Sequence, residues 1–387
     1  MSRFVTWAGV FVVGIALAMP IRATAAREPA SEARTYYLAA PEPVAMPPQP
    51  WVGRVVGIPG PDIIEKSGAA GIPTFTRTVV ARGRTYRYTM VGSDPFAPNA
   101  HSVSVPLVIV PVRFEFDDGS VFDPTELGPA CAGSDTPVNL ALQSPVLHDL
   151  DYGDGSRQYI EQFRRLEFWS QTGRAGALNP GYSVRVSPTV RPAIRVVLTG
   201  FPTKAAPCGR IGMIDHVTWD ALVRTKLFPQ LRRQGISIHT FPLFLFTNVV
   251  MYDRTPTKCC LFGYHSWFNA GGVQTYGVAG YDTSRNFAGS DVSTLSHELG
   301  EWYDDPLVHN PTPPWGHTGQ VSGCQPNLEV GDPLSGHEHA IAMPNGVTYH
   351  PQELAFFSWF YNQVPSLGFD GWYSSGGTFR SPASPCR

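Results

Sequence analysis

Residues 290–304 set the strongest limit on the fold, because their pattern predicts a helix with one apolar face. Ser290 or Asp291 can cap this helix. Pro306 disfavours helical backbone at Asp305, so we expect the helix to end at Asp304 after about four turns. At ~100° per residue, one stripe of the helix is apolar and is expected to pack on the core: Val292, Leu295, Leu299 and Trp302.

Several other segments show the alternation or the apolar runs of strands. They are residues 74–91 around Gly83, 104–116, 182–186, 194–198, 241–252 and 273–281. Helical spacing predicts further helices at 156–171 and at 215–233, the second capped by Asp215 and kinked or shortened by Pro229. With 38 glycines, 37 prolines and 16% charged residues, the chain is not expected to be a helical bundle. The sequence predicts a mixed α/β (α+β) domain with a twisted sheet behind two or three helices.

The N-terminal residues 1–25 have the order of a secretory signal peptide: Arg3, an apolar run at 7–19, then the small residues Ala23 and Ala25. The apolar run is shorter than the ~20 residues that span a bilayer, so we expect no stable membrane insertion. Residues 26–73 begin rich in proline and alanine and predict a linker or a propeptide arm. Residues 74–387 are expected to form one domain, whose C-terminal part from 311 onward is irregular.

Six cysteines suit an oxidising compartment, where an even count usually indicates disulfide bonds. A bond between the neighbours Cys259 and Cys260 would need a strained ring and is not expected. The remaining pairings stay open, and no C-x-x-C pair indicates a cysteine zinc site. With 29 basic and 31 acidic residues and no basic run after the signal segment, nucleic acid is not an expected partner. We expect a secreted protein, in the extracellular space or the periplasm.

The polar side of the predicted helix carries the run His297-Glu298-Leu299-Gly300-Glu301. His297, Glu301 and Asp304 fall opposite the apolar stripe. A histidine and a carboxylate four residues apart lie one turn apart, so both can reach a single cation. Surface helices carry such residues by chance, but carboxylates that crowd together repel one another unless a cation or protons intervene. The carboxylates that could crowd here are Glu298, Glu301, Asp304, Asp305, Glu329 and Asp332.

This H-E-x-x-E run resembles the H-E-x-x-H helix of the zincin metallopeptidases, with Glu301 in place of their second histidine. Zinc also accepts carboxylate oxygen at ~2.0–2.2 Å, so Glu301 can still bind it. The resemblance puts Glu298 in the position of the general base, which takes a proton from the water that the metal activates. It implies a zincin-like fold, with a mixed twisted sheet, an active-site helix and loop-rich extensions.

A longer part of the chain resembles the secreted phosphate-induced, Exordium-like proteins of plants and their bacterial relatives. The similarity rests on residues 260–265, on 297–308 and on the run Glu329-Val330-Gly331-Asp332. It covers residues 241–332 and weakens upstream to 158. Pro333 and Leu334 stand where that family has a cysteine, so its disulfide pattern does not carry over to Cys324. The resemblance leaves the biochemical activity open.

A catalytic zinc takes three protein ligands and a water, so one more ligand is needed. We predict Glu329, with Asp332 as the next choice, because both lie downstream as the third ligand of thermolysin-like enzymes does. Gly331 permits a tight backbone that would aim them inward. His265 is a candidate for stabilising the oxyanion of the tetrahedral intermediate, as a Tyr or His does in zincins. Alternative ligands are Asp305, His265, His309 and the pair His337 and His339.

The leading hypothesis is a zinc-dependent peptidase whose substrate is a peptide or a protein. One histidine with two carboxylates gives a formally neutral zinc site whose water acidifies less, so manganese or calcium is the alternative metal. The competing hypothesis is a non-catalytic secreted protein of the cell envelope or wall, with a structural metal and with exposed aromatics that bind polysaccharide. A pure calcium site is the weakest hypothesis, because calcium needs six or more oxygens and His297 is a poor donor for it.

Overall fold

The computed structural model describes residues 35–41, 71–316, 325–363 and 373–379. Strand residues outnumber helical residues, 37% against 19%, so the expected mixed α/β (α+β) content is confirmed. The predicted signal segment and most of residues 26–73 lie outside the described residues, as do Cys324 and Cys386. Among the described residues, no helix has the length and apolar character to cross a membrane.

The main sheet has eight strands within the described residues and is built around the long strand β4 (Val103–Phe116). The strand order is β1-β9-β4-β12-β16-β15, and β5 and β8 also pair with β4. The other strands are β1 (Thr35–Ala39), β5 (Val121–Phe122), β8 (Val184–Val190), β9 (Ile194–Thr199), β12 (Phe241–Thr247), β15 (Gly263–Asn269) and β16 (Val273–Tyr281). Only β5 and β15 run antiparallel to their neighbours. β4 pairs with β8 along its first half and with β9 along its second, which gives the sheet its curl.

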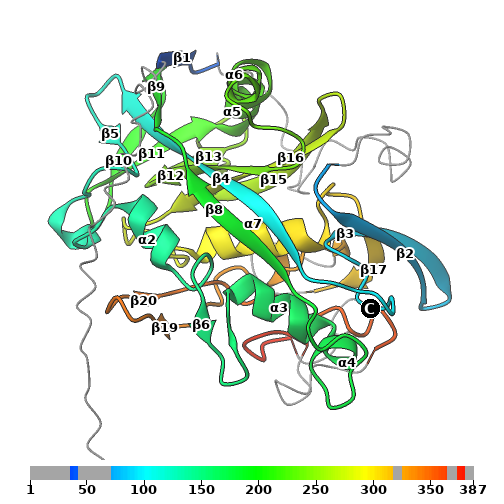
Figure 1. Cartoon of the computed structure of the whole chain (residues 1–387). Coiled ribbons are helices and arrows are strands. Elements are labelled where there is room, and N and C mark those ends of the chain that lie inside the picture. The colour runs from blue at the N-terminus through cyan, green and yellow to red at the C-terminus, as the bar shows by residue number, and fades with distance from the viewer. Residues whose placement is uncertain (1–34, 42–70, 317–324, 364–372, 380–387) are drawn as a thin grey trace, which may run out of the picture. The chain divides into compact units, whose positions relative to one another are not determined.

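Both faces of the sheet are buried, which explains why its central strands are continuous apolar runs. In β4, Leu107 and Ile109 belong to one core cluster, and Val108 and Val110 belong to the other. Figure 1 shows α5 (His216–Leu222) and α6 (Phe228–Arg233) on one side of this sheet, and α3 (Tyr159–Glu167) and α7 (Ser293–Asp304) on the other. The candidate helix α7 therefore packs directly on the sheet.

Shorter elements surround this frame. A second sheet contains β10 (Thr203–Ala205), β11 (Arg210–Asp215), β13 (Val249–Tyr252) and β14 (Cys259–Leu261). The strands predicted around Gly83 are confirmed as β2 (Thr74–Ala81) and β3 (Arg84–Val91), which pair as a hairpin. The remaining elements are α2 (Pro137–Gln143), α4 (Trp169–Thr172), β6 (Leu150–Asp151), β7 (Ser156–Arg157), β17 (Pro311–Trp315), β18 (Gln325–Asn327), β19 (Ile341–Ala342), β20 (Thr348–Tyr349) and two 3-10 turns, Ala130–Ala132 and Asp332–Leu334.

The predicted helix at 215–233 and the predicted strand at 241–252 are each subdivided in the structure. Asp215 caps α5 as expected, accepting from the backbone N–H of Thr218 at 2.8 Å. The chain then forms a π-helical turn, Val223–Leu227, before α6, because Pro229 has no N–H to donate to the regular helical ladder. The strand predicted at 241–252 is two strands, β12 and β13, because Asn248 takes a left-handed conformation (φ 50°) and directs the chain into the second sheet.

Part of the segment predicted as a linker is structured. Thr35–Ala39 forms β1, which pairs in parallel with β9. Tyr36 and Leu38 pack against the second core cluster, whereas Tyr37 points outward and is 75% exposed. This alternation is that of an edge strand with one buried face.

The described cysteines form two disulfide bonds. Cys131 and Cys208 are joined, with their Cα atoms 5.8 Å apart, which confirms the expectation of disulfide bonding. Cys259 and Cys260 are also joined, so the expectation that these neighbours would not bond is wrong. The peptide bond between them is cis, and their Cα atoms are 3.0 Å apart.

Helix α7 begins at Ser293, later than the predicted caps. Val292 occupies the N-cap position without a side-chain hydrogen bond. The carboxylate of Asp291 instead accepts from the backbone N–H of His350 at 2.9 Å. The predicted apolar stripe is buried as expected, but the opposite side is buried too, because the segment after Leu328 covers it.

Candidate metal centre

Contacts on several sides fix the orientation of α7. Trp302 stacks on Phe241 of β12, with ring centroids 3.9 Å apart. Leu354 lies so close to Gly300 that a Cβ there would come within 2.6 Å of the leucine side chain. At the C-terminal end, the Asp304 carboxylate pairs with the Arg164 guanidinium of α3 at 2.9 Å, and both side chains are fully buried. The remaining polar side chains of α7 are held in place by this packing.

His297 lies one turn before Glu301, and its two ring nitrogens have different surroundings. Nδ1 is 3.0 Å from Gln352 Oε1. The amide of Gln352 is itself oriented, because its Nε2 donates to the carbonyl of Gly331 at 2.7 Å, so Oε1 is the acceptor and His297 Nδ1–H is the donor. In the neutral imidazole the lone pair is then on Nε2, which faces the carboxylates. An ordered acceptor behind the ring is the usual backing of a metal-binding histidine.

Glu301 is fixed from the other side by the turn that follows Leu328. Its Oε1 accepts from the backbone N–H groups of Gly331 and Asp332, each at 3.1 Å. A Cβ at position 331 would lie 2.7 Å from His297 Nδ1, so only glycine fits. Gly331 is therefore required because there is no space for a side chain. Its backbone conformation does not require glycine, because a φ of −95° is open to any residue.

A first group of possible metal ligands consists of His297, Glu301 and Asp332, whose ligand atoms all lie within 4.8 Å of one another. His297 Nε2 is 3.1 Å from Glu301 Oε2 and 3.6 Å from Asp332 Oδ1. Two ligands ~2.1 Å from a tetrahedral zinc lie about 3.4 Å apart, so these separations suit a shared cation. This cluster could hold a metal ion. The Asp332 side chain is 25% exposed, more than its partners, so solvent reaches the group from its side.

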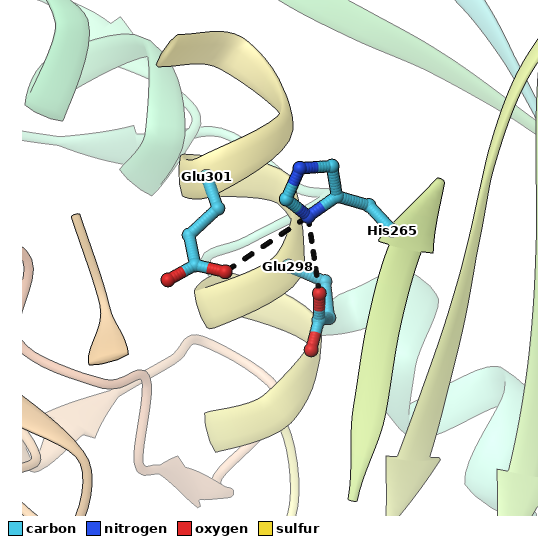
Figure 2. A group of neighbouring side chains, drawn as sticks. All are labelled: His265, Glu298 and Glu301. Carbon is cyan, nitrogen blue, oxygen red and sulfur yellow. Dashed lines mark hydrogen bonds and ion pairs between the residues drawn. The ribbon is translucent and has the colours of Figure 1, made fainter. Parts of the chain in front are cut away.

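A second group consists of His265, Glu298 and Glu301 (Figure 2). His265 projects from β15 toward α7, and its Nδ1 is 3.4 Å from Glu298 Oε2 and 3.9 Å from Glu301 Oε2. Its other nitrogen, Nε2, is 2.9 Å from the carbonyl oxygen of Asp305, which can only accept. The neutral ring therefore also presents its lone pair to the carboxylates. Gly263 leaves room for Glu298, because a Cβ there would lie 2.9 Å from Glu298 Oε1.

Glu329 and Asp332, the two predicted third ligands, take different places. Asp332 belongs to the group with His297, whereas Glu329 belongs to neither group. The Oε2 of Glu329 is 3.9 Å from His265 Nε2. Its carboxyl also shares a side-chain hydrogen bond with that of Glu301, and its buried Oε1 accepts from no donor among the described residues.

Apart from His265, the alternative ligands lie outside both groups. Asp305 accepts from the backbone N–H groups of His309 and Asn310, each at 2.8 Å, and thereby shapes the turn after α7. His309 Nδ1 faces the carbonyl of Leu307, His337 is exposed, and His339 lies 2.9 Å from Ser375 Oγ. Asp304, which shares a face with His297 on the helix, forms the ion pair with Arg164. None of these side chains joins either group.

Burial and mutual repulsion set the protonation of these groups. Burial disfavours charge on His297, but Glu301 outweighs it and raises the histidine pKa well above its usual value. Burial opposes charge on Glu301 as well, yet His297 lowers the pKa of Glu301 to about 2. Burial together with Glu301 raises the pKa of Glu329 well above its usual value, and burial raises that of Glu298. Without a cation the group thus retains protons, and a cation that binds here would displace them.

Gln352 is the residue of this site that sequence reasoning missed. It lies 55 residues after His297, in a stretch without periodicity, and glutamine alone carries no metal-binding signal. Comparisons with protein-family models, with curated proteins and with solved structures gave no match.

Proposed function

We propose that the protein is a secreted, metal-dependent hydrolase that cleaves peptide bonds and that zinc is its metal. The observation that carries this proposal is the convergence of His297 Nε2, Glu301 Oε2 and Asp332 Oδ1, with the histidine backed by Gln352. One imidazole and two carboxylates supply the three protein ligands of a catalytic zinc site and leave one position for water or substrate. Zinc at such a site polarises a carbonyl and makes water acidic enough to attack it near neutral pH.

The role assigned to Glu298 is that of the general base. It neighbours the ligand His297 on α7, and burial raises its pKa above the usual range of a glutamate. A carboxylate with a raised pKa can take a proton from water and return it to a leaving amine near neutral pH. When His265 is protonated, its Nδ1 can donate to this carboxylate, 3.4 Å away, and orient it. Because both nitrogens of His265 face protein groups, this assignment differs from the oxyanion contact suggested by the zincin resemblance.

Export is part of the proposal, supported by the signal-like order of residues 1–25 and by the Cys131–Cys208 disulfide. The substrate is a peptide or protein that approaches from the side of Asp332, the most exposed of the proposed ligands. A second function has one observation in its favour: His297 and Glu301 are both more than nine-tenths buried, as in a structural metal site. That alternative is a secreted envelope or wall protein, binding polysaccharide, whose metal only holds the fold.

The variant Glu298→Gln separates the two functions. In a peptidase it abolishes cleavage of a generic protein substrate such as casein, while at least one metal ion per chain remains. The matched control is Glu161→Gln, which alters a similarly buried glutamate of α3 and is expected to keep activity. A wild-type protein that binds metal but shows no chelator-sensitive cleavage of any protein substrate would favour the structural role.

A further inference from the structure

The second group, on the sheet side of α7, has the same construction as the first. In each group a histidine is backed by an oxygen acceptor, Gln352 Oε1 for His297 and the Asp305 carbonyl for His265. In each group the opposite ring nitrogen faces Glu301 Oε2, at 3.1 Å from His297 and 3.9 Å from His265. Two ligands that both lie ~2.1 Å from one cation are at most about 4.2 Å apart, so both separations suit a shared ion.

One cation cannot satisfy the lone pairs of both histidines. A neutral imidazole that points its unprotonated nitrogen at a carboxylate sets two electron-rich atoms against each other. A cation or a proton between them removes this repulsion. An ion beside His297 serves only that histidine, which leaves His265 Nδ1 facing Glu298 Oε2 and Glu301 Oε2.

The charge of the carboxylates and the surroundings of Glu329 also favour a second cation. The carboxylates of Glu298, Glu301, Glu329 and Asp332 carry four negative charges when ionised. One divalent cation leaves two of these charges to be neutralised by protons, whereas two divalent cations can balance all four. Glu329 Oε1 is buried and accepts from no donor among the described residues, and the Glu329 carboxyl lies against that of Glu301. Two buried carboxyl groups in contact need a proton or a cation between them, and a cation bound at Glu301 would meet this need.

We propose that the protein binds a pair of divalent cations that share Glu301. One cation is held by His297, Glu301 and Asp332, and the other by His265, Glu298 and Glu301, with Glu329 balancing their charge. The turn at Gly331 holds Glu301 Oε1, so Oε2 is the atom that lies between the two positions. This inference rests on the metal centre of the proposed function and keeps its reaction class. When the position beside His265 is filled, Glu298 is a metal ligand instead of the general base. Two cations ~3.5–4 Å apart would then both activate the water and polarise the substrate.

The test is to titrate the metal-free full-length protein with Mn²⁺ and to record bound ions per chain together with electron paramagnetic resonance spectra. We expect two ions per chain and, at full loading, the altered spectrum of an exchange-coupled pair. The variant His265→Ala should bind one ion with an uncoupled spectrum. The control His309→Ala, which alters a histidine outside both groups, should still bind two coupled ions.

One ion per chain in the wild type, or two ions that never couple, would overturn the shared pair and leave the proposed function standing. No binding of Mn²⁺ would overturn the shared pair, and if Zn²⁺ does not bind to the metal-free protein either, the proposed function falls as well. The wild-type spectrum decides the matter even if His265→Ala does not fold.

Discussion

Replacing Gln352 by leucine tests whether the backing of His297 matters for metal binding. The leucine removes the oxygen that accepts from His297 Nδ1–H at 3.0 Å and frees the ring to rotate or change tautomer. Loss of such a backing group lowers metal affinity about 10- to 100-fold, which is about 1.4–2.7 kcal/mol. The buried carbonyl of Gly331 also loses its donor, so a lower free energy of unfolding is expected as well.

The assay is competition for Zn²⁺ against a chromophoric chelator, carried out on folded protein. The matched control is Gln158→Leu, which alters an equally buried glutamine whose amide binds the backbone of Leu147 and Val186 near the start of α3. We expect Gln158→Leu to lose stability and keep zinc affinity. Equal zinc affinity in Gln352→Leu and wild type, or equal losses in both variants, would refute the reasoning.

Three further predictions concern stability. Substituting Arg164 by methionine leaves the Asp304 carboxylate buried without its cation and should lower the free energy of unfolding, measured in urea, by about 3–5 kcal/mol. An unchanged urea midpoint would show that the ion pair does not stabilise the fold. Replacing Cys131 and Cys208 by serine opens a loop with a sequence separation of 77 residues and should cost up to about 4 kcal/mol, measured against the wild type with and without reductant. Two arginines lower the pKa of Glu115 to about 2, so ionised Glu115 stabilises the fold above pH ~4.5 and this stabilisation is lost as the pH falls toward 2. The free energy of unfolding of Glu115→Gln should therefore be lower than that of the wild type at pH 7 and approach it in acid. A difference that stays constant with pH would contradict this.

The sequence was informative where a local pattern determines the structure. The apolar period of residues 290–304 predicted α7 and its buried stripe, and the run in β4 predicted a doubly buried strand. The split at Asn248 was not predictable in this way, because it depends on one left-handed residue within an unbroken apolar run.

The site residues also divide into those that a local sequence pattern predicts and those that it does not. The spacing of His297 and Glu301 fixed their proximity, because four residues make one helical turn. The choice between Glu329 and Asp332 depends on how the turn at Gly331 meets the imidazole, which no local pattern encodes. His265 comes near the helix only through the pairing of β15 with β16, and Gln352 only through the path of the chain after the site.

The most direct test is a crystal structure of the zinc-loaded protein with anomalous data collected on both sides of the zinc absorption edge. We predict a peak ~2.0–2.2 Å from His297 Nε2, Glu301 Oε2 and Asp332 Oδ1. Zinc bound only at other residues, or His297 and Glu301 turned away from every peak, would contradict the assignment of this cluster as the metal centre.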